Sequence, residues 1–281
     1  MTEALNRDYQ VCEEIGRGRF GTVFRCTSRI SGESFAVKSI DKSLISGDTL
    51  DSQCLLSEPK ILQFLAPDHH IVQIFAVYED DYHLHMVLEL CDSQDLYHHL
   101  MNKGILSESE SKSIITQLLQ AISHMHKLGI VHRDIKPDNI LFSSGNVVKI
   151  SDFGSAEFFN NESEELMRGV VGTPYYVAPE VVAGRDYNEK VDIWSAGVVL
   201  YIMLAGFPPF YGDTVTETFE AVLRGNLRFP TQVFQSVSPM AKDLLRKMLC
   251  KEVSRRFSAE QVLPSLIKYI TKLSLFNFKI L

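Results

Sequence analysis

Cysteine and tryptophan are scarce in this sequence of 281 residues, which has five cysteines and one tryptophan. The cysteine count is odd and no two cysteines form a Cys-x-x-Cys pair, so neither a disulfide framework nor a zinc site is predicted from them. Widely separated single cysteines are typical of proteins that are kept reduced inside the cell. We therefore expect free, mostly buried thiols.

Long hydrophobic runs and targeting segments are also missing. The longest apolar run, 191–205, contains Asp192 and Ser195 and is too short to cross a bilayer, so it predicts a buried helix. No basic-then-apolar leader opens the sequence, and Thr2 rather than glycine follows Met1, which argues against N-myristoylation. These absences favour a cytoplasmic protein with no stable membrane association.

Positive charge is in deficit. The sequence has 28 lysines and arginines against 35 acidic residues, for a net charge of −7. General nucleic-acid binders are usually basic, so no nucleic-acid partner is expected, although an acidic face could receive a basic peptide. The sequence also shows no internal repeat, no low-complexity tract and no EF-hand loop.

The most informative stretch is 131–139, Val-His-Arg-Asp-Ile-Lys-Pro-Asp-Asn, which Asp-Phe-Gly at 152–154 follows. Phosphate transfer from ATP needs a carboxylate that orients the attacking hydroxyl and takes its proton, a lysine against the phosphate, and amide and carboxylate ligands for Mg²⁺. We assign these roles to Asp134, to Lys136, and to Asn139 with Asp152. The alternative is a charged surface loop between two strands, which the order and spacing of both motifs disfavour.

A glycine-rich segment at 15–23, Ile-Gly-Arg-Gly-Arg-Phe-Gly-Thr-Val, precedes Lys38. Glycines at this spacing let backbone N–H groups approach phosphates without a Cβ in the way. Alternating residues around the segment predict strands, and the later Ala-Val-Lys at 36–38 gives the order of a kinase rather than the strand–turn–helix of a dinucleotide site. The alternative for Lys38 is a solvated strand lysine.

Hydrophobic spacing predicts the elements between these motifs. Strands are expected at 71–78 and 82–90, and a helix at 107–128, whose apolar residues recur at intervals of three and four. A helix is also expected at 52–65, where Pro59 requires either a kink or a regular part that starts near Glu58. His124 and His126, on the 107–128 helix, are expected to be exposed rather than metal ligands.

Together with Gly-Thr-Pro-Tyr-Tyr-Val-Ala-Pro-Glu at 172–180, these motifs resemble eukaryotic protein kinases over nearly the whole chain. The resemblance implies an α+β, two-lobed protein-kinase fold. It places an antiparallel sheet and helix C in an N-terminal lobe at 1–91, and a mainly helical C-terminal lobe at 92–263. Lys136 and Thr173 match the serine/threonine type.

The same resemblance implies ATP and Mg²⁺ as cofactors and assigns the site. Lys38, Asp134, Lys136 and Thr173 are expected to be catalytic, with Thr173 bonded to Asp134 and Lys136, and Asn139 and Asp152 are the expected metal ligands. The expected nucleotide-binding residues are Ile15, Gly16, Gly18, Gly21, Val23, Ala36, Lys38, Glu58, Leu88, Glu89, Cys91, Asp95, Asn139, Leu141 and Asp152.

Several supporting contacts are implied as well. Glu58 should pair with Lys38, although Pro59 makes this the least secure pair. Asp192 should bond the backbone of the catalytic loop, and Arg256 should pair with Glu180. The alternative role of Asp95 is to cap the helix that follows it.

The segment between Asp152 and Glu180 resembles an activation segment. Many kinases use the arginine of His-Arg-Asp to bind a phosphothreonine there, but the corresponding position is Gly169, which has no hydroxyl. We therefore expect no requirement for an activation-segment phosphate. Glu164 or Glu165 could pair with Arg133 instead.

Longer segments of the sequence resemble the phosphoenolpyruvate carboxylase kinases of plants, which are close to plant calcium-dependent protein kinases. These segments are EIGRGRFGTVFRC, HRDIKPDNILF and DFGSAEFF. That resemblance implies a serine near the N-terminus of phosphoenolpyruvate carboxylase as the substrate, relief of malate inhibition, and a monomer that acts without calcium. Asp95 should receive a basic residue three before the target. Asp138 lacks its usual acidic companion, because Ile202 stands there, so the position two before the target should matter less.

The end of the sequence departs from the family. The usual His-Pro-Trp is absent, and 264–281 is a hydrophobic and basic tail that could form a last helix, lie on a membrane surface, or be a non-native sequence. Two other functions compete with the kinase. A pseudokinase or scaffold would need a tail that abolishes activity, and a small-molecule phosphotransferase would lack the Ala-Pro-Glu at 178–180.

Overall fold

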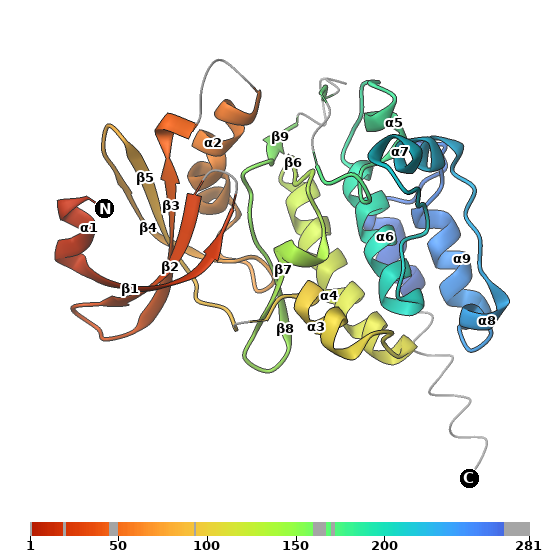
Figure 1. The fold of residues 1–281 in the computed structure, drawn as a ribbon, viewed down its shortest axis with the longest axis horizontal. Coiled ribbons are helices and arrows are strands. Elements are labelled where there is room, and N and C mark those ends of the chain that lie inside the picture. The colour runs from red at the N-terminus through yellow and green to blue at the C-terminus, as the bar shows by residue number, and fades with distance from the viewer. Residues whose placement is uncertain are drawn as a thin grey trace, which may run out of the picture. The chain divides into compact units, whose positions relative to one another are not determined.

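The computed structural model describes residues 2–18, 21–44, 50–92, 94–159, 167–169 and 172–266, with the side chains of 44 and 50–56 excepted. The chain divides into two compact units that are each discontinuous in sequence. The first consists of Met1–Asp95 and Leu141–Ala156, and the second of Leu96–Ile140 and Glu157–Leu281 (Figure 1).

The first unit is built on an antiparallel five-stranded sheet with strand order β1-β2-β3-β5-β4. Its strands are β1 Tyr9–Arg17, β2 Gly21–Ser28, β3 Ser34–Asp41, β4 Ile74–Glu79 and β5 His83–Leu88, and its other elements are α1 Glu3–Asp8, η1 Lys42–Leu44, α2 Leu50–Leu65 and the ladder of β7 Ile140–Ser143 with β8 Val147–Ile150. The expected strands are thus confirmed.

The short helix α1 was not predicted from the sequence. The Thr2 hydroxyl caps it by accepting a hydrogen bond from the Leu5 N–H at 3.1 Å. Leu5 is fully buried in a cluster with Cys26, Val37 and Val87. A single apolar side chain thus anchors α1 to the sheet, and one residue gives no periodic signal.

Helix α2 continues through Pro59, so the alternative of a helix that starts near Glu58 is wrong. Proline removes one backbone hydrogen bond inside a helix and crowds the preceding turn. Burial of Ile61, Leu62 and Leu65 after the proline offsets that cost.

The second unit is mainly helical (Figure 1). Its elements are α3 Leu96–Lys103, α4 Glu108–Lys127, β6 Ile130–Val131, η2 Pro137–Asn139, β9 Glu157–Phe158, α5 Pro179–Val182, α6 Lys190–Ala205, α7 Val215–Arg224, α8 Thr231–Phe234, α9 Pro239–Met248, and a helical segment at 259–266. With the sheet of the first unit, this confirms the expected α+β class.

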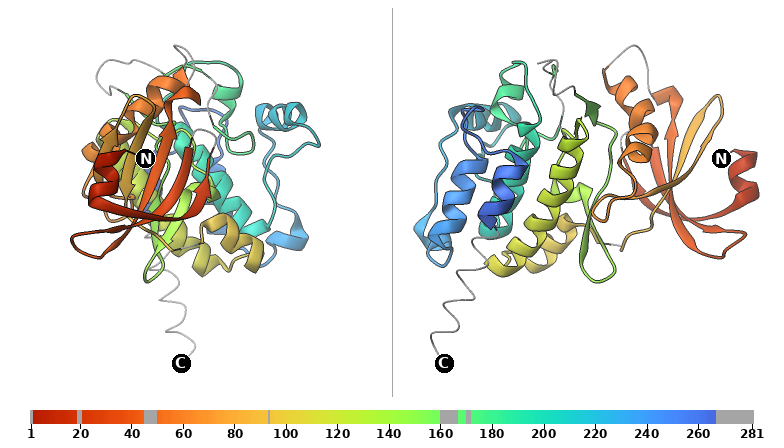
Figure 2. Two further views of the ribbon diagram at one scale, coloured as in Figure 1. Left: turned by 60° about the vertical axis from the view of Figure 1, so that its left-hand side comes forward. Right: turned by 180° about the vertical axis from the view of Figure 1, so that it is seen from behind.

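Helix α6 is the centre of the second unit. It packs between α4 and α9, as Figure 1 and the right-hand view of Figure 2 show. All of its residues except Lys190 and Ile202 are buried, as expected for a helix that is hydrophobic on every side. The predicted buried helix is therefore confirmed, and none of the helices in the described part of the chain has the length and hydrophobicity that a bilayer span requires.

The start of the atypical tail belongs to a helix. Residues 264–266 continue the helical segment that begins at 259, and Leu266 is buried. The three expectations for the remainder of the tail, 267–281, lie outside the described residues.

Candidate active site

Strand register places four of the expected nucleotide-site residues on one face of the sheet in the first unit. Lys38 pairs with Val23 on one side, and Ala36 pairs with Leu88 on the other. Paired residues share a face, as do residues two apart on a strand, so Val23, Ala36, Lys38 and Leu88 lie together. Ile15 is exposed on the neighbouring strand β1.

Lys38 joins two carboxylates. Its Nζ lies 2.8 Å from both carboxylate oxygens of Glu58 and 2.6 Å from Oδ1 of Asp152. Glu58 is 1% exposed on α2, whereas Asp152 is 49% exposed. The structure thus brings Lys38 and Glu58 together despite Pro59.

The charge state of Lys38 follows from these neighbours. Burial by itself would lower the pKa of Lys38, but the carboxylates of Asp152 and Glu58 outweigh burial and raise the pKa above its ordinary value. Lys38 therefore stays a cation at neutral pH.

Glu58 has a second role that the sequence did not suggest. Its Oε1 accepts a hydrogen bond from the backbone N–H of Phe153 at 3.1 Å, and Phe153 is fully buried. Asp152 immediately precedes this anchored residue and has a φ of +60°, a conformation that is uncommon outside glycine. Glu58 thereby holds the backbone that orients Asp152.

The three glycines of the glycine-rich segment differ in their surroundings. A Cβ at Gly21 would lie 2.2 Å from the Ser39 carbonyl oxygen, so the sheet itself requires glycine there. A Cβ at Gly16 or Gly18 would meet no atom closer than 3.8 Å. Of the three glycines, Gly16 and Gly18 are therefore the two whose missing side chain leaves space that a phosphate could approach. Arg19 and Phe20 lie outside the described residues.

The segment after β5 contains Glu89 and Cys91, the residues whose backbone is expected to contact adenine. The Glu89 N–H donates to the Gln73 carbonyl at 2.8 Å, and the Glu89 carboxylate pairs with Lys149 at 2.8 Å. An adenine contact of Glu89 must therefore use its carbonyl oxygen. Burial, and to a smaller extent the Glu89 charge, raises the pKa of the Cys91 thiol to about 12, so this cysteine stays a thiol.

Leu141 and Asp95 form an isolated antiparallel bridge within the first unit. This bridge places Asp95 beside β7. The two roles expected for Asp95 stay predictions.

The second unit contains the loop between β6 and β7, residues 132–139, which is the catalytic loop expected from the sequence. Lys136 Nζ lies 2.7 Å from Oδ2 of Asp134 and 3.1 Å from Oγ1 of Thr173, and the Thr173 hydroxyl donates to Oδ1 of Asp134 at 3.0 Å. The Asn139 amide nitrogen donates to the Asp134 carbonyl at 2.9 Å. The structure thus brings together Asp134, Lys136, Asn139 and Thr173, and holds the Asp134 carboxylate in one orientation.

Asp192 on α6 holds this loop by its backbone. Its carboxylate accepts hydrogen bonds from the backbone N–H groups of His132 at 3.0 Å and Arg133 at 2.9 Å, and from His126 Nε2 at 2.8 Å. Complete burial works to raise the pKa of Asp192, but the His126 hydrogen bond, the nearby histidines and the His132 N–H outweigh it and lower the pKa. Asp192 is therefore a buried carboxylate that stays ionised.

Of the two histidines expected to be exposed, His124 is only partly exposed, and the expectation is wrong for His126. Its ring is 9% exposed because the Asp192 carboxylate needs a donor from α4 as well as from the loop. The imidazole reaches from α4 to α6, and so links the helix that supports the loop to the helix that carries Asp192.

Arg133 pairs with a carboxylate that was not anticipated. Its Nη1 contacts Glu157 on β9 and lies 3.4 Å from the Tyr187 hydroxyl. The Arg133 side chain is 2% exposed and Glu157 is 36% exposed. Glu164 and Glu165, which were the expected partners, lie outside the described residues.

Gly172 sets the approach of Thr173 to the loop. Its φ is +105°, and a Cβ at this position would lie 2.8 Å from the Arg133 carbonyl oxygen. Glycine is therefore needed for the backbone to come close enough that Thr173 reaches Asp134. Further along the chain, Arg256 pairs with Glu180 through two contacts of 2.5 and 2.8 Å, which is the pairing expected from the sequence.

The metal-ligand types fit Mg²⁺. Magnesium takes oxygen ligands, and the expected ligands are the half-exposed carboxylate of Asp152 and the Asn139 amide oxygen. The Asn139 nitrogen is the atom that faces Asp134, which assigns the oxygen to the other side of the amide.

Comparison with known proteins extends over almost the whole chain. Residues 9–266 match the family model described as protein kinase domain. Calcium-dependent protein kinase 29 of Arabidopsis thaliana is 40% identical over 273 residues, which cover 96% of this chain and 50% of that protein. Calcium-dependent protein kinase 19 of Oryza sativa subsp. japonica is 38% identical over 258 residues, which cover 91% of this chain and 48% of the relative. The chain thus spans about half the length of the curated relatives that it matches.

Proposed function

This chain belongs to the protein kinase family and is a serine/threonine protein kinase, and we propose a specific reaction for it. In that reaction it transfers the γ-phosphate of ATP to a serine of phosphoenolpyruvate carboxylase. The observation that supports phosphate transfer is the Asp134 carboxylate, which Lys136, Thr173 and Asn139 orient from three directions. A base that must accept a proton from one hydroxyl requires such a fixed orientation.

Each of these residues has a separate task in the reaction. Asp134 orients the substrate hydroxyl and takes its proton as the oxygen attacks the phosphorus. Lys136 and Lys38 are cations that offset the negative charge of the phosphates. Asn139 and Asp152 would hold Mg²⁺, which neutralises phosphate charge when it is bound.

The Arg133–Glu157 pair supports activity without an activation-segment phosphate. A phosphate usually neutralises the arginine of His-Arg-Asp and orders the segment around it. Glu157 is a carboxylate of the chain itself and already contacts the Arg133 guanidinium. We infer that Glu157 takes the place of the phosphate, and expect chain produced in bacteria and free of phosphate by mass spectrometry to be fully active.

The substrate and the calcium response rest on resemblance. For the substrate, the segments EIGRGRFGTVFRC and HRDIKPDNILF are similar to those of phosphoenolpyruvate carboxylase kinases. For the calcium response, these 281 residues contain no EF-hand loop. We therefore propose that these 281 residues act as a cytoplasmic monomer, that their activity is equal in calcium and in a calcium chelator, and that the product is a carboxylase less sensitive to malate.

A pseudokinase or scaffold is the second candidate, and one assay separates the two functions. Radiolabelled phosphate transfer to intact phosphoenolpyruvate carboxylase is measured with the wild-type chain, with Asp134→Asn, and with Asp243→Asn as a matched control on the exposed surface of α9. We expect labelling by the wild type and Asp243→Asn and none above background by Asp134→Asn. Equal labelling by all three would refute the role of Asp134, and labelling of a carboxylase that lacks its N-terminal serine would refute the substrate assignment.

A further inference from the structure

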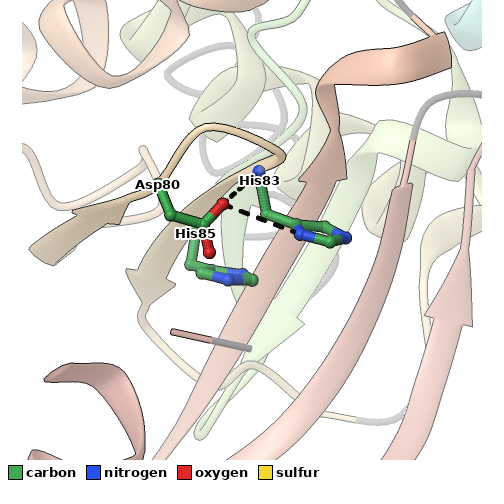
Figure 3. Close-up of side chains that lie close together, drawn as sticks. All are labelled: Asp80, His83 and His85. Carbon is green, nitrogen blue, oxygen red and sulfur yellow. Dashed lines mark hydrogen bonds and ion pairs between the residues drawn. The ribbon is translucent and has the colours of Figure 1, made fainter. Parts of the chain in front are cut away.

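The turn between β4 and β5 brings together one carboxylate and two imidazoles that take no part in the proposed phosphate transfer. Asp80 opens the turn, and His83 and His85 stand two residues apart on β5, so they share one face of the strand (Figure 3). One ligand atom from each of Asp80, His83 and His85 lies within 4.8 Å of the other two.

His85 is the observation that points to a ligand. Its side chain is fully buried, and neither ring nitrogen has a hydrogen-bond partner among the described residues. Buried polar groups are normally satisfied, and a buried imidazole with two unused nitrogens is rare without a metal, water or catalytic role.

The backbone of the turn holds the Asp80 carboxylate in a fixed position. Its Oδ1 accepts hydrogen bonds from the N–H groups of Tyr82 at 2.8 Å and His83 at 2.6 Å. They fix the carboxylate beside the His83 ring, whose Nδ1 lies 3.8 Å from the same oxygen (Figure 3). The other oxygen, Oδ2, is then available as a ligand.

We propose that Asp80, His83 and His85 bind one divalent transition-metal ion of the zinc type, with water completing the coordination. Two imidazoles and a carboxylate form a ligand set that Zn²⁺ accepts in tetrahedral sites, whereas Mg²⁺ and Ca²⁺ prefer oxygen ligands alone.

The present geometry is close to such a site but requires side-chain rotation. The rings of His83 and His85 are stacked, with centroids 5.6 Å apart and planes 9° apart. Metal–ligand bonds of about 2.0–2.2 Å place ligand atoms roughly 3.3 Å from each other in a tetrahedron. The His83 side chain is 35% exposed, so it is the ligand that has room to rotate.

The charges around the three ligands permit a cation. Lys42 lies beside the turn, where its Nζ contacts the Asp80 carbonyl at 2.6 Å and the Glu79 carboxylate at 2.6 Å, so Glu79 offsets its charge. Asp41 pairs with His83 across the β3–β5 ladder and adds a further anion on that side.

Register also separates the ligands from Lys38 within the first unit. Lys38 pairs with Met86, and His85 is the residue before Met86, so His85 points to the opposite face of the sheet. Loss of the metal site should therefore leave the basal kinase activity unchanged.

The test uses the full chain and Zn²⁺ alone, with Mg²⁺ in excess to occupy magnesium ligands. Zn²⁺ binding is measured by competition with a chromophoric chelator for the wild type, His83→Ala and His85→Gln, with His98→Ala on the exposed face of α3 as the matched control. Because His83 is partly exposed, its variant should fold even if the buried His85 variant does not.

We expect the wild type and His98→Ala to bind one equivalent, and His83→Ala to bind at least tenfold more weakly, in line with the loss of one ligand. Zn²⁺ should also raise the melting temperature of the wild type but not of folded His83→Ala. Equal Zn²⁺ affinity of His83→Ala and the wild type, or no binding by the folded wild type, would overturn the proposal. Either result would leave the kinase function intact, since that function is tested by Asp134.

Discussion

Replacement of Asp192 by asparagine tests how the catalytic loop is held. Asp192 is fully buried, and its two oxygens accept three hydrogen bonds, from His126, His132 and Arg133. Asparagine keeps one acceptor oxygen and places an NH₂ group where the other stood. Either the Arg133 N–H or the pair of His126 and His132 donors must then face another donor.

The size of the effect follows from this count. A hydrogen bond to a charged group contributes about 1.5–3 kcal/mol, and a buried donor without a partner costs about 1–3 kcal/mol. We therefore expect Asp192→Asn to reduce the free energy of unfolding by about 2–4 kcal/mol. In a chain of this size that corresponds to a fall in melting temperature of roughly 5–10 °C.

The effect should depend on pH. The folded-state pKa of Asp192 lies below its ordinary value of 3.8, so its ionised form stabilises the fold above that pH. This stabilisation is lost as the pH falls through the lower, folded-state pKa. The difference in stability between the wild type and Asp192→Asn should thus be full at neutral pH and shrink in strong acid.

Thermal unfolding and steady-state kinetics together check the reasoning. Asp243→Asn, on the exposed surface of α9, is the matched control and should melt with the wild type. Asp192→Asn should also lower kcat more than it raises KM for ATP, because it loosens the loop that carries Asp134. An Asp192→Asn chain within about 0.5 kcal/mol of the wild type would show that the three hydrogen bonds do not hold the loop.

The remaining predictions concern other ion pairs and the substrate. Lys38→Met should lower kcat by about 10²–10³-fold, because it removes a cation from the phosphates; wild-type kcat in a folded Lys38→Met chain would refute this role. Glu157→Gln leaves the Arg133 guanidinium without its carboxylate, so we expect lower activity of unphosphorylated chain and a loss of about 1–3 kcal/mol, since Glu157 is partly screened by solvent; full activity would mean that Arg133 needs no anion. In a peptide array, arginine or lysine three before the target serine should matter more than at two before it, and Asp95→Asn should remove that preference; equal turnover of a peptide with alanine three before the serine would contradict the assignment.

Much of the fold could be predicted because its signals are local. Alternation identified the strands, and the continuous apolar run identified α6. Asp134 and Lys136 could be grouped in advance because phosphate transfer requires a base and a cation together, and the resemblance to protein kinases added Thr173. Spacing alone could not show that Pro59 lies inside a continuous helix, because tertiary burial decides whether the lost hydrogen bond is tolerated.

The burial of His126 had a signal that polarity obscured. Buried Leu119 and Ile122 stand seven and four residues before it on α4, so position 126 continues the apolar stripe. The buried position of His85 had no such signal, because β5 is an interior strand that is covered on both faces and alternation fails there. Glu157 could not be chosen as the partner of Arg133, since that contact depends on the pairing of β6 with β9.

The two functional clusters share one physical solution. Each has a carboxylate to which we assign a role in phosphate transfer, next to a residue held by a buried carboxylate: Glu58 accepts the Phe153 N–H beside Asp152, and Asp192 accepts the N–H groups just before Asp134. A non-glycine residue with positive φ lies at or next to each held position: Arg133, at +67°, is itself held, and Asp152, at +60°, precedes the held Phe153. Such backbone conformations cost about 1–3 kcal/mol each and persist only where the surroundings enforce them. The buried acid therefore stabilises a strained backbone, and the strained backbone fixes the direction of the acid that meets the substrate or the metal.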